Sequence, residues 1–221
     1  MCGEVDWEVI EDRIRVPKFP NEWGSIDDAM KTLIHVYRRE RWAEQENYVE
    51  AWVEKDALSG VLEPITNDYH IHLLVCRGYS SISAMHDSAL RFREHSDKDC
   101  YLLYFGDHDP SGEDMVRDID GRLAEFGADV EVRKIALTKD QVNRYKLPPN
   151  PAKSTDPRAR DYIAEHGRES WELDALPPET LRTLLTDALD DLVDKGLYEQ
   201  VKEQEESDKA KMKNFGKRNA T

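Results

Sequence analysis

Two aspartates separated by one residue, Asp107 and Asp109, are the side chains of this sequence best placed to do chemistry. They follow the short apolar run Tyr101 to Phe105 and precede the turn residues Pro110 and Gly112. An apolar run of this length bounded by turn residues is typical of a buried strand. Carboxylates delivered together at a strand end can bind one hard cation, and Mg²⁺ prefers oxygen ligands. The spacing therefore predicts a Mg²⁺ site, with Mn²⁺ as a substitute, at the carboxyl edge of a parallel sheet.

A second strand-like run supplies another carboxylate. Residues 48–54 end in Glu54, which precedes Lys55 and a helical stretch. In an open α/β sheet, ligands bind beyond the carboxyl ends of the strands, so we expect Glu54 to lie near the two aspartates. This second acid favours a metal site over the other settings of Asp-x-Asp, which are sugar-nucleotide transferases, phosphatases with an aspartate nucleophile, and ordinary acidic turns.

The order of the apolar runs predicts an α/β fold. Strands are expected at 50–54, 71–76, 100–106 and 129–135, and helices at 56–64, 81–95 and 112–126. Such alternation indicates a Rossmann-like, mostly parallel sheet with helices on both faces. A short helix is expected to begin at Thr138.

Helices are expected both before and after the sheet domain along the chain. An N-terminal helix capped by Ser25 is predicted to continue to Trp42, and helix 178–194 carries leucines on one face. The Glu/Lys-rich C-terminal extension predicts an exposed helix with a flexible end from Lys209 to Arg218. The expected divisions are an N-terminal extension (1–47), a sheet domain (48–146), a Pro-rich loop and helical extension completing that domain (147–195), and a charged, partly flexible tail (196–221).

The residues around the acids resemble the Toprim domain. The resemblance rests on Glu-Lys-Asp-Ala at 54–57 and on Gly-Asp-His-Asp-Pro-Ser-Gly at 106–112, and it covers residues 45–145. It is closest to the A subunit of topoisomerase VI and its meiotic double-strand-break relatives. Those proteins carry a proline after a Gly-Tyr or Gly-Phe turn, where this chain has Ser80.

The resemblance implies roles for individual residues. Asp107 and Asp109 would hold Mg²⁺, and Glu54 would act as a third ligand or as a general acid/base, which makes these three the expected catalytic residues. Lys55, Arg77 and Ser111 are expected to contact phosphate or nucleic acid, although Lys55 or Arg77 could instead cover the sheet edge. Lys153, which lies outside the resemblance in the Pro-rich loop, is a further expected contact, with a simple connector as the alternative role of that loop.

Three further acids are weaker candidates for metal ligands. Glu113 begins the helix after the aspartates, where an acid also interacts favourably with the helix dipole without any metal. Glu172 and Asp174 alternate in a Trp-Glu-Leu-Asp-Ala-Leu segment, similar to strings that follow the metal motif in other Toprim proteins. Asp174 could instead cap the next turn. His108 is expected to point away from the aspartates.

The function implied by the resemblance is Mg²⁺-dependent action on nucleic-acid phosphodiesters, with DNA nicking or cleavage as the leading expectation. The segment before the first strand is too short for the tyrosine-bearing winged-helix domain of topoisomerase VI. Tyr37 and Tyr48 are interpreted as packing residues, so either metal-activated water, as in OLD-type nucleases, or a partner supplies the nucleophile.

Two alternatives remain open. The chain could be a non-autonomous topoisomerase VI A-like subunit or an architectural DNA-binding protein that needs a winged-helix or ATPase partner. It could also perform primase-type nucleotidyl transfer, although no zinc-ribbon cysteines accompany the motif. A homodimer is compatible with each of these functions.

Charge is the feature that fits DNA least, because the chain carries a formal net charge of −15. Phosphate contacts normally require basic surface. Local basic strips, or ordinary solvated faces, are expected from Arg13, Arg15 and Lys18 and from Arg133, Lys134, Lys139, Arg144 and Lys146.

The remaining composition indicates a cytoplasmic protein. No apolar stretch approaches the ~20 residues that a membrane span needs, and the start lacks a signal-peptide pattern. The odd number of cysteines argues against a disulfide framework, and Cys76 and Cys100 are predicted to be small core residues.

Overall fold

The computed structural model describes residues 20–76, 81–151 and 158–219. These residues form two compact units, one of residues 39–204 and one that combines the chain up to Arg38 with the chain from Glu205 onward. Several residues of the sequence analysis lie outside the described ranges, namely Cys2, Arg13, Arg15, Lys18, Arg77, Ser80 and Lys153.

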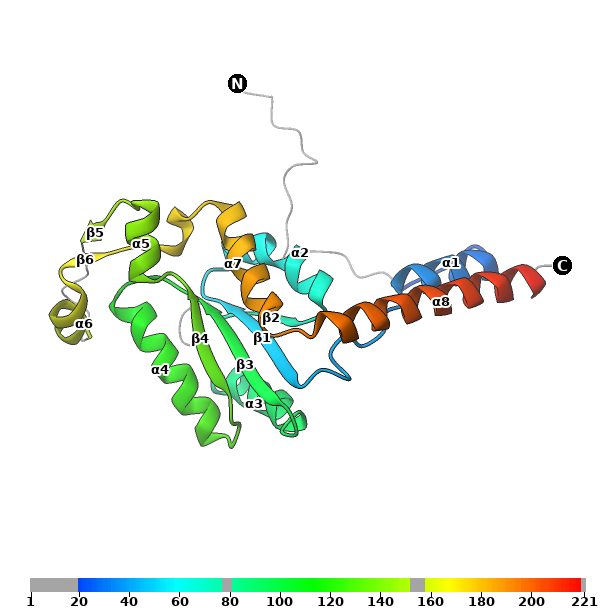
Figure 1. Ribbon diagram of the computed structural model, residues 1–221, viewed down its shortest axis with the longest axis horizontal. Coiled ribbons are helices and arrows are strands. Elements are labelled where there is room, and N and C mark those ends of the chain that lie inside the picture. Colours follow the sequence, from blue (N-terminus) through cyan, green and yellow to red (C-terminus); the bar gives the residue numbers. More distant parts are fainter. Residues whose placement is uncertain (1–19, 77–80, 152–157, 220–221) are drawn as a thin grey trace, which may run out of the picture. The chain divides into compact units, whose positions relative to one another are not determined.

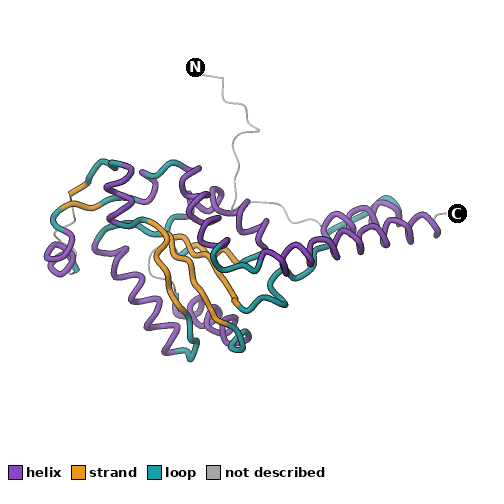
Figure 2. Tube along the Cα trace, viewed as in Figure 1, coloured by secondary structure: helices purple, strands orange, loops and turns teal. Residues whose placement is uncertain are grey.

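A four-stranded parallel sheet forms the centre of the larger unit (Figures 1 and 2). Its strands are β1 (Asn47–Val53), β2 (His72–Val75), β3 (Asp99–Phe105) and β4 (Glu131–Ala136). They are arranged in the order β2-β1-β3-β4. The chain places β2 on one side of β1 and then crosses to place β3 on the other, so the strand order reverses between β1 and β3.

Helices cover both faces of the sheet, as the sequence predicts for a Rossmann-like α/β fold (Figure 1). One face carries α2 (Ser59–Tyr69), preceded by the short η2 (Asp56–Leu58), and α7 (Pro178–Asp190). The other face carries α3 (Ile82–Glu94) and α4 (Pro110–Glu125). Successive strand residues point to opposite faces, so Val53 and Phe105 enter the first core while Trp52 and Tyr104 enter the second.

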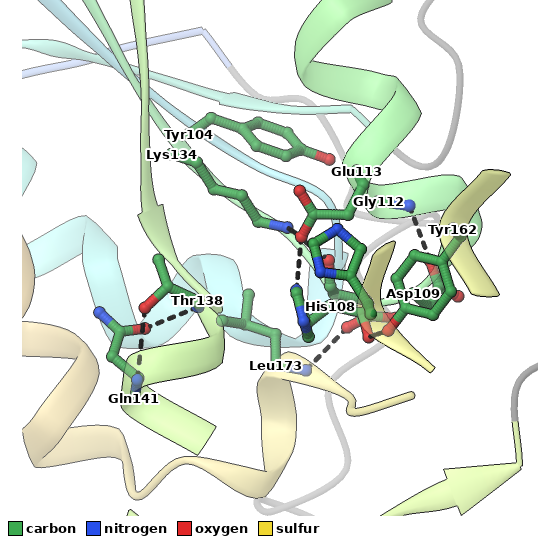
Figure 3. A network of polar contacts seen from close by, with 12 residues as sticks. Tyr104, His108, Asp109, Gly112, Glu113, Lys134, Thr138, Gln141, Tyr162 and Leu173 are labelled. Carbon is green, nitrogen blue, oxygen red and sulfur yellow. Dashed lines mark hydrogen bonds and ion pairs between the residues drawn. The ribbon is translucent and has the colours of Figure 1, made fainter. Parts of the chain in front are cut away.

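The segment after β4 returns to the carboxyl edge of the sheet. It comprises α5 (Lys139–Tyr145), β5 (Asn150–Pro151), α6 (Ala159–His166), β6 (Glu169–Ser170) and η3 (Leu173–Ala175). Thr138 begins α5 as predicted, through a reciprocal capping box with Gln141 (Figure 3). Beyond β6, His108 and Trp171 exchange backbone hydrogen bonds of 2.8 and 2.9 Å, which fix this returning segment beside the end of β3.

The smaller unit contains α1 (Ile26–Val36) and the C-terminal part of α8 (Lys195–Asn219). Ser25 caps α1 as predicted, because its hydroxyl oxygen accepts a hydrogen bond from the Asp28 amide. The predicted continuation of the helix to Trp42 is wrong. Trp42 is buried in the core of the larger unit, where its indole N–H donates to the Tyr69 carbonyl oxygen at 2.7 Å, and this tertiary contact overrides the helical pattern. Residues 209–218, expected to be flexible, belong to α8.

The described residues agree with two further expectations. Cys76 and Cys100 are buried core residues that form no disulfide, as predicted. No helix within the described ranges combines the length and the apolar character that crossing a bilayer requires.

Gly112 is the position where α4 approaches the end of β3 most closely. A Cβ atom on Gly112 would lie 2.1 Å from the backbone carbonyl oxygen of Asp107, so no larger residue fits without movement of the backbone. At Gly121, in the same helix, an added Cβ atom would meet nothing within 4 Å.

These two glycines make a matched test of the close approach. We expect Gly112→Ala to destabilise the fold by about 1–3 kcal/mol, because overpacking here pushes α4 away from Asp107. Gly121→Ala should instead stabilise it by about 0.5–1 kcal/mol, since alanine is the better helix former. Urea unfolding followed by circular dichroism measures both. Equal effects of the two substitutions would show that the approach of α4 is not tight.

Candidate functional site

The ends of β1 and β3 bring Glu54 and Asp107 together. Val53 pairs with Phe105, and the Glu54 amide donates to the Phe105 carbonyl oxygen at 2.8 Å. Glu54 Oε2 then accepts a hydrogen bond of 3.0 Å from the Asp107 amide and one of 3.4 Å from the Tyr104 hydroxyl. The pair lies where the strand order reverses, which is the usual place for ligands in an open α/β sheet.

Asp107 is held from two directions. Its side chain is buried, and its Oδ1 accepts a hydrogen bond of 2.7 Å from the Leu173 amide of η3. The same oxygen lies 3.2 Å from Lys55 Nζ. The carboxylate is therefore fixed between the end of β1 and the segment that returns after β6.

Asp109 is the N-cap of α4. Its Oδ1 accepts a hydrogen bond of 2.6 Å from the Gly112 amide, which places the carboxylate at the positive end of the helix. Ser111 lies in the first turn of the same helix, where backbone N–H groups favour anions.

Lys55 carries one positive charge into a group of three acids. Its ammonium lies 3.2 Å from Asp107, 3.1 Å from Glu172 and 3.5 Å from Asp174. The structure therefore brings Glu172 and Asp174 to the site through a shared lysine.

Glu113 faces a different set of partners. Its Oε1 lies 2.5 Å from His108 Nδ1 and 2.7 Å from Lys134 Nζ, as Figure 3 shows. Burial acts to raise the pKa of Glu113, but these two partners outweigh burial and lower the pKa to about 2. Lys134 also donates to the Asp107 carbonyl oxygen at 2.8 Å. Glu113 therefore forms a half-buried ion pair that ties α4 and the loop after β3 to β4.

His108 is the residue that the sequence analysis underrated. Its ring is buried against Trp171, Tyr162 and His166, and its carbonyl oxygen lies 3.0 Å from the Tyr162 hydroxyl. These partners come from distant parts of the chain, so the local sequence around the aspartates could not reveal them.

The basic cluster predicted after the fourth strand is dispersed among several partners. Lys134 is part of the Glu113 ion pair, Arg133 pairs with Glu131 at 2.6 Å, and the Lys139 ammonium lies 3.6 Å from the centre of the Trp171 ring. The described residues of this cluster therefore do not form one basic strip at the site.

Burial raises the pKa values of two of the acids. For Glu54, the negative charges of Asp107 and Asp109 add to the effect, whereas the Asp107 amide and Lys55 oppose it. For Asp107, burial again dominates, opposed by the Leu173 amide and Lys55. Carboxylates whose charge is incompletely compensated are typical of sites that receive a cation or exchange a proton.

The site offers carboxylate oxygens, the donor type that Mg²⁺ prefers. Within the described residues, no group of three or more His, Cys, Asp or Glu side chains is placed so that it could hold a metal ion. Mg²⁺, however, is commonly bound by one or two carboxylates, with water and substrate phosphate as the other ligands. Glu54, Asp107 and Asp109 supply oxygen ligands of this kind, and Lys55 already places a cation beside Asp107.

Comparison with models of known protein families finds no match, and comparison with curated proteins finds none either.

The raised pKa of Glu54 predicts a pH-dependent cost in stability. Above the ordinary pKa of a glutamate, the group is charged in the unfolded chain but resists charging in the fold, so stability falls as the pH rises through the raised value. Glu54→Gln removes this cost and keeps an oxygen for the Asp107 amide. We expect the variant to unfold a few degrees above the unsubstituted protein at pH 8 in EDTA.

The difference should disappear below the ordinary pKa of a glutamate, where the carboxyl group is protonated in both states. Thermal unfolding followed by circular dichroism across this pH range measures it. Glu125→Gln, at an exposed position of α4, is the matched control and should leave the profile unchanged. A Glu54→Gln protein that is less stable than the unsubstituted protein at pH 8 would contradict the raised pKa of Glu54.

Proposed function

We propose that this chain is a Toprim-type protein that uses Mg²⁺ to nick or cleave nucleic-acid phosphodiesters, with DNA as the first substrate to test. The observation that carries the proposal is the hydrogen bond of the Glu54 carboxylate with the Asp107 amide at the carboxyl ends of two neighbouring parallel strands, with the charges of Asp107 and Asp109 close enough to raise the pKa of Glu54. These are the residues to which the Toprim resemblance assigns the chemistry.

Each acid has a distinct role in this proposal. Asp107 and Asp109 hold the metal, whose positive charge would neutralise a phosphodiester oxygen when it is bound. Glu54 accepts the proton of the attacking water, for which a pKa raised by burial is suited. The first turn of α4, with Ser111, presents backbone N–H groups to the phosphate.

Lys55 links metal binding to phosphate binding. Its ammonium and a divalent cation would share Asp107 as a partner, so the two positive charges repel each other. Release of Lys55 from Asp107 frees its ammonium to contact a substrate phosphate, the role expected from the sequence.

The environments of the tyrosine hydroxyls, which could serve as nucleophiles, favour a second candidate function, that of a subunit that depends on a partner protein. Tyr104, which contacts Glu54, and Tyr162, which contacts the His108 carbonyl oxygen, are buried, and burial raises both pKa values. Tyr48 donates to Glu50 in the core and Tyr37 donates to Asp208, so both are packing residues. None of these four hydroxyls is poised as a nucleophile, so the proposal draws on water or on a group from a partner.

Conversion of supercoiled plasmid to nicked or linear DNA tests the proposed function. We expect the purified chain to convert it with Mg²⁺ or Mn²⁺ and not with EDTA. Asp109→Asn and Glu54→Gln should each slow conversion by about 100-fold or more, because each removes a charge used in the reaction.

The matched control is Asp120→Asn, an exposed acid on α4 that should retain full activity. Conversion that persists in the Asp109 and Glu54 variants would identify a contaminating nuclease. No conversion by a folded chain that still binds Mn²⁺ would reject the autonomous nuclease and leave the partner-dependent subunit.

Metal affinity provides a separate test of Lys55. We expect Lys55→Met to tighten Mn²⁺ binding by about 3- to 10-fold, because a competing positive charge has been removed. Titration calorimetry, or electron paramagnetic resonance of free Mn²⁺, measures the affinity without relying on turnover.

Lys202→Met is the control, because Lys202 pairs with Glu199 on α8 and has no contact with the acids of the site. Its affinity should match that of the unsubstituted chain. Weaker or unchanged binding in Lys55→Met would show that Lys55 and the metal do not compete for Asp107.

A further inference from the structure

The α1 helix of the smaller unit has an apolar surface that is wider than one neighbouring helix covers. At 100° per residue, its apolar side chains occupy one continuous arc, and its charged residues Asp27, Asp28 and Lys31 lie on the opposite side. Met30, Ile34 and Tyr37 form one half of this arc and are half-buried. The Tyr37 hydroxyl donates to Asp208 of α8 at 3.2 Å, so this half belongs to the contact within the unit.

The other half of the arc is open to solvent. Ile26 is 85% exposed, Leu33 48% and Val36 59%, and the half-buried Ala29 completes their row. The spacing of these four positions, three then four then three residues, is that of an apolar seam between packed helices. Trp23 borders the row, because its indole N–H donates to the Thr32 hydroxyl at 3.1 Å, and it is itself half-exposed.

An 11-residue helix with no fully buried side chain gains little stability by itself. Burial of the exposed row would supply the missing apolar contact. The flanking positions of the row carry Thr32, Met30 and Tyr37, so no charged side chain borders it.

We propose that this row, the α1 seam of Ile26, Ala29, Leu33 and Val36, is the contact between two copies of the chain, with their α1 helices antiparallel. The four positions are symmetric about residue 31, so a two-fold axis there places Ile26 against the partner's Val36 and Ala29 against the partner's Leu33. The small alanine then faces the large leucine in both halves of the interface, which is the self-complementarity that a symmetric dimer requires.

The helix dipoles favour the same antiparallel arrangement. Asp27 and Asp28, in the first turn of α1, lie away from the seam and pair with Lys31 of the same helix. Antiparallel packing sets the positive end of each helix dipole beside the negative end of the other, whereas parallel packing would place like ends together.

Sedimentation velocity of the full chain over a range of concentrations tests the dimer. The unsubstituted chain should dimerise, also in 0.5 M salt, because the contact is apolar. Ile26→Glu should weaken dimerisation by about 100-fold or more, since a symmetric contact loses the isoleucine twice. Ile26 is almost fully exposed in the single chain, so this substitution leaves the fold intact. The matched control, Ile82→Glu at a 70% exposed position of α3, should dimerise normally.

The alanine–leucine pair tests the antiparallel register. Ala29→Leu and Leu33→Ala should each weaken the dimer, and the double variant should restore it, because each leucine again faces an alanine. A monomeric unsubstituted chain at 100 µM would overturn the proposal, and so would a dimer that Ile26→Glu does not affect. Failure of the double variant to restore the dimer would overturn the antiparallel register. None of these outcomes depends on nuclease activity.

Discussion

The pairing of β1 with β3 is the interaction on which the rest of the structure depends. The two strands are joined from Asn47–Asp99 to Val53–Phe105, and they are the only described strands of the parallel sheet with a neighbour on each side. Their pairing fixes both cores, because alternate residues enter opposite faces. It also continues beyond the last backbone pair, since the Glu54 side chain accepts the Asp107 amide. The candidate site is thus an extension of the hydrogen-bonded ladder.

Two glutamates of the same chain segment, Glu50 and Glu54, differ in how far their neighbours compensate the cost of burying a negative charge. Glu50, inside β1, is fully buried and accepts hydrogen bonds from Arg91, Tyr48 and Trp52 at 2.7–3.0 Å. Its charge is paired and its hydrogen-bonding capacity is used, as a structural role requires. Glu54 accepts a hydrogen bond from one backbone amide and a long one from Tyr104, and Lys55 offsets its charge only in part, with two other acids nearby. This difference distinguishes a core residue from one available to a ligand.

The sequence predicted those features that depend on local signals. The apolar run ending in Asp107, the caps at Ser25 and Thr138, and the alternation of strands and helices were predicted because periodicity and capping act within a few residues. The end of α1 was mispredicted because Trp42 is held by Tyr69, far along the chain. The Glu113 ion pair could not be anticipated, because His108 and Lys134 meet it only in the folded sheet. The order of the strands in the sheet was not predicted either, because tertiary packing sets it.

The return of the chain after β6 has a consequence for the protein during its synthesis. β1 and β3, with their acids, leave the ribosome well before Trp171 and Leu173, whose backbone groups bind His108 and Asp107. A nascent chain that ends before these residues contains the sheet but leaves the Asp107 carboxylate and the loop after β3 without their final partners. Asp107 therefore reaches its native arrangement only late in translation, when Leu173 has been made.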